Sequence, residues 1–276
     1  MTEREIFEIE NTRPHVVILG AGATIATIPN GDKNGNPCSV MHGFIHNLGL
    51  DTILATVKLN TKSENIEDVY SELYERGDEC KAVREQLEEA IFSYLSRLEL
   101  PAEITVYDEI ILALTQKDMI ATFNWDPLLI QAYNRARKLT TNLPKLTFLH
   151  GNVAAGYCER CGHFGALQRV KCDNCGAAYH RSPLLFPVKH KDYNSNPFIK
   201  QQWTILNEFL SRAKMLTIFG YSAPKTDVEA AQMLKSAFEK YLPAQRFSHI
   251  DIIERPNFED ENLRNTWREF INDSSC

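Results

Sequence analysis

Short apolar runs that recur between helical stretches are the feature of this 276-residue sequence that most restricts its fold. Each run is long enough for one buried strand, and most are followed by residues with helical spacing. The runs lie at residues 15–19, 119–123, 145–149, 215–219 and 249–253. Strands that alternate with helices predict an α/β fold, in which a parallel sheet carries helices on its faces.

Two segments interrupt this alternation, and we expect both to lie within a single domain that spans residues 1–276. Residues 39–115 are rich in helical patterns and predict a helical insertion against the sheet. Its apolar residues at helical spacing are expected in the core: Val69, Leu73, Val83, Leu87, Ala90, Ile91, Tyr94 and Leu95. Residues 151–196 contain many turn-forming residues and predict a small, loop-rich lobe.

Four cysteines in this lobe have the spacing of a metal site. They form two Cys-x-x-Cys pairs with ten residues between them: Cys158, Cys161, Cys172 and Cys175. Each two-residue gap lets both thiolates reach one ion, so the pattern favours a structural zinc site over a redox dithiol or disulfides. A disulfide framework is more typical of short secreted chains. The other cysteines, Cys38, Cys80 and Cys276, are interpreted as unpaired thiols in a reducing compartment.

Charge and hydropathy restrict the partners of the chain. A formal net charge of −6 disfavours direct binding to nucleic acid, because phosphate contacts require a basic face. No apolar run approaches the roughly 18 residues that a membrane span needs. We therefore expect a cytoplasmic protein whose partners are small molecules or other proteins.

Polar residues follow four of the predicted strands, at the edge of a parallel sheet where ligands bind. They are Gly20–Thr24, the pair Asn124 and Asp126, His150, and Gly220–Ser222. Gly20 and Gly22 let the backbone approach a diphosphate, although a glycine-rich turn of this kind is often only a packing feature. Asn124 and Asp126 also suit the cap of a helix that begins at Pro127, and His150 suits a hydrogen-bonded turn.

Five motifs, in this order, resemble the sirtuin family over most of the chain. They are Gly20-Ala21-Gly22-Ala23-Thr24, the Thr-x-Asn-x-Asp of residues 122–126, His150-Gly151, the two cysteine pairs and Gly220-Tyr221-Ser222. The resemblance implies a Rossmann-like domain with a helical module and a zinc lobe. It also implies that the protein binds NAD and cleaves its glycosidic bond to nicotinamide.

The same resemblance implies roles for particular residues. Gly20, Ala21, Gly22 and Thr24 match the loop that holds the diphosphate, and Gly220 and Ser222 match the turn that faces the dinucleotide. Asn124 and Asp126 match residues that position the ribose, the attacking group and the nicotinamide amide. His150 matches the catalytic histidine. These roles suit the chemistry, since cleavage builds positive charge on the ribose carbon and histidine accepts a proton near neutral pH.

Three segments depart from the sirtuins that deacylate proteins. Phe123 replaces a glutamine, residues 28–32 lack the family's polar pattern, and Leu185-Phe186-Pro187-Val188 places a proline in the strand that pairs with a peptide. The Thr-x-Asn-aromatic-Asp of residues 122–126 and the Gly-Tyr-Ser-Ala-Pro-Lys-Thr-Asp of residues 220–227 are more similar to a bacterial sirtuin-like branch, several members of which hydrolyse NAD in antiphage defence. We therefore expect an NAD hydrolase, with a protein-lysine deacylase and an NAD or ADP-ribose sensor as alternatives. Such an enzyme needs control by an activating partner protein or a homo-oligomer.

Overall fold

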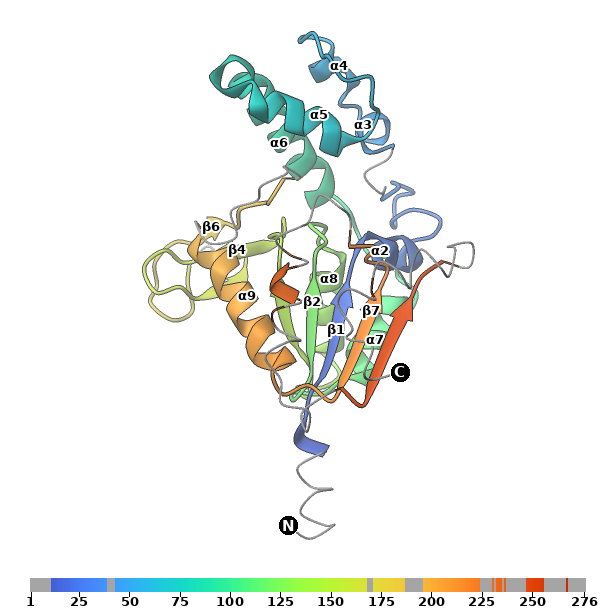
Figure 1. Ribbon diagram of the computed structural model, residues 1–276. Coiled ribbons are helices and arrows are strands. Elements are labelled where there is room, and N and C mark those ends of the chain that lie inside the picture. The colour runs from blue at the N-terminus through green and yellow to red at the C-terminus, as the bar shows by residue number, and fades with distance from the viewer. Residues whose placement is uncertain are drawn as a thin grey trace.

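A five-stranded parallel sheet forms the centre of the protein, as the recurring apolar runs predict. The computed structural model describes residues 11–38, 43–167, 171–186, 196–223, 230, 232–234, 236, 247–255 and 267 (Figure 1). The strands, in the order in which they neighbour one another, are β3 (Lys145–Phe148), β2 (Met119–Thr122), β1 (His15–Leu19), β7 (Met215–Phe219) and β8 (His249–Ile253). All five predicted strands are confirmed, and only β2 and β3 end one residue early.

The strand order reverses direction beside β1. From β1 the chain continues to β2 and β3 on one side, and then crosses to β7 and β8 on the other. The carboxyl ends of β1 and β7 thus lie side by side, with Leu19 paired to Phe219. In open parallel sheets a reversal of this kind leaves a crevice in which ligands bind.

Alternate residues of β1 belong to two different cores, because successive side chains of a strand point to opposite faces. Val16 and Ile18 pack with Trp203 of one helix, α9 (Pro197–Leu210). Val17 and Leu19 pack with two other helices, α7 (Val106–Ala113) and α8 (Leu128–Ala136). Helices therefore cover both faces of the sheet, which confirms the α/β prediction (Figure 1).

Local capping fixes where two of these helices begin. At the start of α7, Thr105 and Asp108 form a capping box, in which each side chain bonds to the backbone near the other. At the start of α9, the side chain of Asn196 accepts hydrogen bonds from the N–H groups of Phe198 and Ile199, and Pro197 occupies the first helical position.

A group of helices lies above the carboxyl ends of the strands in Figure 1. The members of this helical module are α3 (Phe44–Asn47), α4 (Asp51–Leu54), α5 (Ile66–Glu75), the 3₁₀ helix η1 (Gly77–Cys80) and α6 (Lys81–Ser96). The apolar stripe expected in the core is buried or packed against the core at every position. None of the helices in the described ranges combines the length and apolarity that a membrane crossing requires.

The residues with the cysteine pairs form a second, smaller sheet. Its antiparallel strands, in spatial order, are β5 (Phe164–Ala166), β4 (Ala155–Tyr157) and β6 (His180–Arg181). Strands of two or three residues bury little apolar surface, so the described part of this lobe has no large core of its own. Below, residues 151–186 are called the small lobe.

Candidate functional site

The turn after β1 is bonded to the turn after β7 through backbone atoms. The N–H of Gly20 donates to the carbonyl of Phe219 at 3.0 Å, and the N–H of Gly22 donates to the carbonyl of Gly220 at 2.9 Å. A Cβ at Gly20 would overlap the Gly220 carbonyl oxygen, and Gly220 has φ +63°. The glycines are therefore required for close packing, and the N–H of Gly22 is already used within the protein.

One short helix follows this turn, α2 (Ala21–Thr27). The first amides of an α-helix have no intrahelical acceptor, so the N–H of Ala21 has none within α2. Thr24 lies in the next turn, and its side chain is 1% exposed. Of the predicted diphosphate loop, the structure thus leaves Ala21 the clearest backbone donor, whereas Thr24 belongs to a buried hydrogen-bond network.

Asn124 joins this network from the end of β2. Its Nδ2 donates to the carbonyl of Gly20 at 2.7 Å and to Oγ1 of Thr24 at 2.8 Å. Its backbone N–H donates to Oγ1 of Thr122 at 3.0 Å. Asn124 remains half-buried.

Asp126 binds the same threonine from the opposite side. The hydroxyl of Thr24 donates to Oδ2 of Asp126 at 2.8 Å, and the N–H of Leu128 donates to Oδ1 at 3.0 Å. The second bond gives an acceptor to the first N–H of α8, but α8 begins at Leu128 and not at Pro127, and its N-cap, Pro127, makes no side-chain cap bond. Burial raises the pKa of the Asp126 carboxyl, against the opposing effect of these hydrogen bonds.

Two residues that sequence reasoning missed complete the network. The hydroxyl of Tyr107, on α7, lies 2.8 Å from Oγ1 of Thr24. Nδ2 of Asn152 donates to the backbone carbonyl of Asp126 at 2.6 Å and to that of Asn124 at 3.3 Å. A polar residue two positions after His150 is a weak signal for Asn152, but the sequence around Tyr107 gives none.

His150 follows β3 and is only 6% exposed. The ring of Phe123 meets it edge-on, with the ring centroids 4.8 Å apart. Phe123 in turn stacks on Tyr221 at 4.0 Å and contacts Trp203 at 6.0 Å. Phe123 therefore forms part of an aromatic wall beside the histidine.

The segment after β6 is bonded directly to the His150 turn. The N–H of Leu185 donates to the carbonyl of His150 at 2.9 Å, and Gly151, at φ +83°, leaves no space for a Cβ beside the Pro183 carbonyl. Phe186 lies between two rings, 4.9 Å from Tyr70 and 5.0 Å from Trp125. Pro187 and Val188, on which the prediction of impaired peptide docking rests, lie outside the described residues.

The remaining predicted residue of the dinucleotide turn is less constrained. Ser222 is exposed, whereas its neighbour Tyr221 is buried. Residues 224–227, which complete the Gly-Tyr-Ser-Ala-Pro-Lys-Thr-Asp pattern, lie outside the described ranges. Thus β1, β2 and β7 bring Gly20, Thr24, Asn124, Asp126 and Gly220 together. The side chain of Asn152, two residues after His150, bonds to the carbonyls of Asn124 and Asp126, and the N–H of Leu185 bonds to the carbonyl of His150.

The four cysteines of the small lobe converge on one point. Their sulfur atoms all lie within 4.8 Å of one another. The Cys158–Cys175 and Cys161–Cys172 sulfur distances are 3.4 and 3.6 Å, too long for disulfide bonds. Four thiolates about 2.3 Å from a zinc ion in a tetrahedron lie roughly 3.8 Å apart. The donors thus fit a closed structural zinc site.

At Cys161, hydrogen bonds from neighbouring groups favour the thiolate form that binds metal. Hydrogen bonds lower the pKa of Cys161 to about 6; the largest effect comes from the side chain of Asn174 and the next from the backbone of His163. His163 and His180 are not needed as ligands, because the cysteines alone make up the group of possible ligands. Cys38 and Cys80 are free, as expected, and Cys276 lies outside the described residues.

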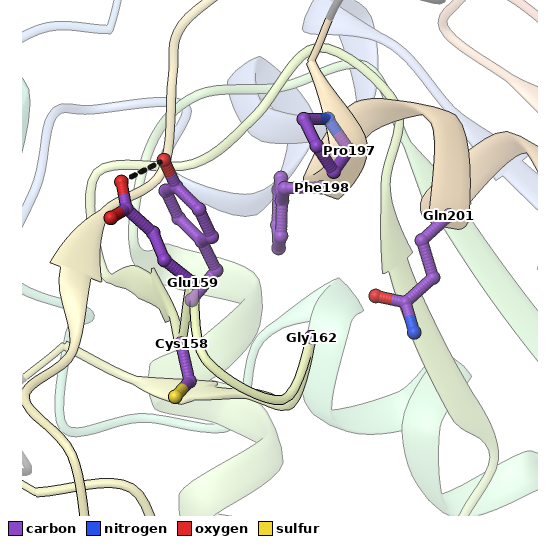
Figure 2. Close-up of a pocket in the computed structure, with 7 residues that line it drawn as sticks. Cys158, Glu159, Gly162, Pro197, Phe198 and Gln201 are labelled. Atoms are coloured by element: carbon purple, nitrogen blue, oxygen red, sulfur yellow. Dashed lines mark hydrogen bonds between the residues drawn. The ribbon is translucent and has the colours of Figure 1, made fainter.

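A pocket of about 320 Å³ lies between the small lobe and the start of α9 (Figure 2). Its wall is largely aromatic, with Tyr157 and Phe198 beside the exposed Glu159, whose carboxylate accepts from the tyrosine hydroxyl at 3.2 Å. None of the strand-end residues lines it. The pocket is therefore separate from the strand-end network.

Comparisons with known proteins give low similarities. No protein-family model and no curated protein matches the chain. Solved structures include a Sir2 protein with a p53 peptide and NAD⁺, at 18% identity, with 98% of each chain covered and a TM-score of 0.38. Another is Sir2 bound to an acetylated peptide, at 17% identity, 97% of each chain and a TM-score of 0.39. At these TM-scores the similarities establish neither a shared fold nor a shared activity.

Proposed function

We propose that this protein cleaves the bond between nicotinamide and ribose in NAD and transfers the ADP-ribosyl group to water. The main supporting observation is the network at the strand ends, where Asn124, Thr24 and Asp126 are held by direct hydrogen bonds beside the His150 turn. The motif resemblance to sirtuins supplies the identity of the substrate. Open parallel sheets bind nucleotides at the strand ends where the strand order reverses, and here that position is beside the β1–β7 pair.

The reaction breaks one bond and forms one. The bond from C1′ of the ribose to the nicotinamide nitrogen breaks, and its electron pair leaves with nicotinamide. A water oxygen bonds to C1′, and the proton of that water passes to a base. The products are nicotinamide, ADP-ribose and one proton.

Each strand-end residue has a role that its chemistry can perform. Cleavage builds positive charge on C1′, which a neutral amide tolerates and a carboxylate stabilises, so Asn124 is assigned to orient the water or ribose and Asp126 to stabilise the charge. His150 is assigned as the base, since imidazole accepts a proton near neutral pH. Ala21 and Gly220 are assigned to the dinucleotide backbone.

The zinc ion has a structural role in this proposal. Cys158, Cys161, Cys172 and Cys175 would hold it, and four thiolates leave no position for a substrate. The ion instead fixes the small lobe, from which Leu185 and Ser182 reach the loop after β3. Residues 151–196 are thus proposed as one metal-organised lobe, and residues 39–115 as a helical insertion, within one domain.

Peptide deacylation is the less favoured activity on structural grounds. A peptide that adds a strand needs free backbone donors on the edge it joins. The N–H of Leu185 already donates to His150, and the Phe186 side chain is held between Tyr70 and Trp125. A water nucleophile requires no peptide.

Control of the enzyme belongs to the same proposal. Unregulated hydrolysis would deplete NAD, so we infer that an activating partner or self-assembly controls it. Antiphage defence, which the motif resemblance implies, is a setting in which such depletion is useful.

The test is product release from NAD. Purified protein is incubated with NAD, with and without an acetyl-lysine peptide, and nicotinamide and ADP-ribose are followed by chromatography. We expect nicotinamide and ADP-ribose to be released in equal amounts when no peptide is present. Strict dependence on peptide, with an acetylated ADP-ribose product, would identify a deacylase. Binding of NAD without cleavage would leave a sensor or an enzyme that awaits its activating partner.

Two histidine variants sharpen this test. His150→Ala is expected to lower kcat by about 10²- to 10⁴-fold, the usual contribution of a general base, with little change in KM for NAD. His249→Ala is the control, because His249 begins β8 at the opposite edge of the sheet. Full turnover by His150→Ala would mean that the base is another group.

A further inference from the structure

Tyr107 has a hydroxyl group whose position in the core is explained only by the strand-end network. Its side chain is fully buried, and burial raises its pKa well above the usual value. The hydroxyl lies 2.8 Å from Oγ1 of Thr24 and 3.2 Å from Nδ2 of Asn124. A phenylalanine would fill the same space in the core without a polar atom, so the hydroxyl group is what distinguishes this position.

The orientation of the Asn124 amide follows from its partners. The carbonyl oxygen of Gly20 can only accept a hydrogen bond, so the amide atom 2.7 Å away from it must be Nδ2. The second Nδ2 hydrogen faces Thr24 and Tyr107. Among the described residues no group donates to Oδ1 of Asn124, so this acceptor is left for a ligand.

The hydrogen-bond directions around Thr24 place Tyr107 as a donor. The only hydroxyl hydrogen of Thr24 is used by the carboxylate of Asp126. Its two lone pairs then accept from Nδ2 of Asn124 and from the hydroxyl of Tyr107. With Tyr107 in place every position on the threonine oxygen is filled, and the Asn124 amide has one favoured orientation.

We propose that Tyr107 is a positioning residue: its hydroxyl, bonded to Thr24 and Asn124, holds the amide so that Oδ1 is presented to the ribose or the attacking water. The inference rests on the proposed function, because NAD hydrolysis supplies the ribose or water to which Oδ1 of Asn124 is presented. An amide turned the other way would present N–H groups to a carbon that is becoming positive, and would repel it. Tyr107 thus acts on the reaction through Asn124 and does not contact the reacting atoms.

Tyr107→Phe tests this role, because it removes one oxygen atom and keeps the ring. The buried hydrogen bonds of the hydroxyl to Thr24 and Asn124 are lost, so kcat is expected to fall by about 5- to 10-fold. KM for NAD is expected to stay within about twofold, since the diphosphate contacts are untouched. An unchanged kcat, or an effect on KM alone, would overturn the proposal.

The matched control is Tyr70→Phe. Tyr70 is also buried, and its hydroxyl donates to Glu88 at 2.5 Å within the helical module. This variant loses a buried hydroxyl bond far along the chain from Asn124, so a purely structural effect would appear in both variants. Equal losses of kcat in the two variants would contradict a positioning role.

A second readout separates this inference from the proposed function. Hydrogen exchange of the Asn124 side-chain amide is followed by NMR in ligand-free protein, with the resonance assigned by its loss in Asn124→Ala. Exchange is expected to quicken by about fivefold or more in Tyr107→Phe and to stay unchanged in Tyr70→Phe. If the variants give this exchange result but the wild-type protein does not cleave NAD, the hydrolase proposal is refuted and the positioning role is not. Unchanged exchange would refute the positioning role even if NAD is cleaved.

Discussion

The strand-end network and the four-cysteine cluster both gather polar side chains from separate loops, but they rest on different foundations. Beneath the network are fully buried strand residues such as Ile18 and Ile120, and its hydrogen-bonding groups pair with one another. Beneath the cysteines are strands of two or three residues, and β6 is exposed. The first site can form without a ligand, whereas four close thiolates repel one another until a cation binds.

The largest effect is expected from breaking the cysteine cluster. In Cys158→Ser the small lobe should lose zinc and its structure, because zinc binding worth about 10–16 kcal/mol in small domains is coupled to their folding. Cys158 is buried, so no other ligand can easily take the place of its thiolate when serine is introduced. Zinc content by atomic emission and proteolysis of residues 151–186 measure the loss, while far-UV circular dichroism reports on the main sheet.

Cys80→Ser is the control for this prediction. Cys80 is also a buried free cysteine, but it belongs to η1 in the helical module. It should keep the full zinc content. A folded Cys158→Ser protein with bound zinc and normal turnover would show that the cluster has no structural role.

A smaller loss is expected from disturbing the strand-end turns. In Gly220→Ala the added Cβ would lie 2.5 Å from backbone atoms of Gly22, and the residue must keep φ +63°. Overpacking costs about 1–3 kcal/mol, and a left-handed conformation adds about 1–2 kcal/mol. Urea unfolding should therefore show a loss of about 2–5 kcal/mol from the two terms together.

Gly77→Ala separates these two terms. Gly77 has nearly the same φ, +62°, but a Cβ there meets nothing within 4 Å. Only the conformational cost should appear, so the difference between the variants measures the contact between the β1 and β7 turns. Equal losses would mean that the close approach of these turns contributes nothing to stability.

The sequence predicts the framework of the site better than its hydrogen bonds. Hydrophobic runs specify the strands, and the parallel arrangement then places Asn124 near Gly20 and Thr24 because strand ends meet at one edge. Cysteine spacing specifies the metal cluster in the same direct way. Both features depend on local patterns, which sequence reasoning reads well.

Tyr107, Asn152 and the bond between Gly22 and Gly220 depend on how distant segments meet. The Tyr107 hydroxyl reaches Thr24 only because α7 packs beside α2, and the sequence separation is 83 residues. Likewise, the glycine pattern cannot show that the N–H of Gly22 is used by the β7 turn and not by a diphosphate. Such pairings are set by tertiary packing, which a single sequence does not display.

The smallest effect is expected where exposed side chains join the small lobe to the helical module. Arg181 of β6 lies over the ring of Phe92 on α6, with its guanidinium carbon 4.1 Å from the centroid, and pairs with Glu89 at 2.9 Å. The side chains of Arg181 and Glu89 are 56% and 64% exposed, so solvent screens the pair. Arg181→Ala should cost about 1 kcal/mol or less from the cation–π contact and the ion pair together.

Glu89→Gln divides that small loss into its parts. It removes the ion pair but keeps the arginine over the Phe92 ring, so it should cost less than Arg181→Ala. Its cost should also vanish in 1 M salt, where the Debye length is about 3 Å, whereas the cation–π contribution persists. Urea midpoints of both variants at low and high salt measure this. Losses of several kcal/mol would mean that the small lobe depends on the helical module as much as on its metal, and the contrast between the two regions would no longer hold.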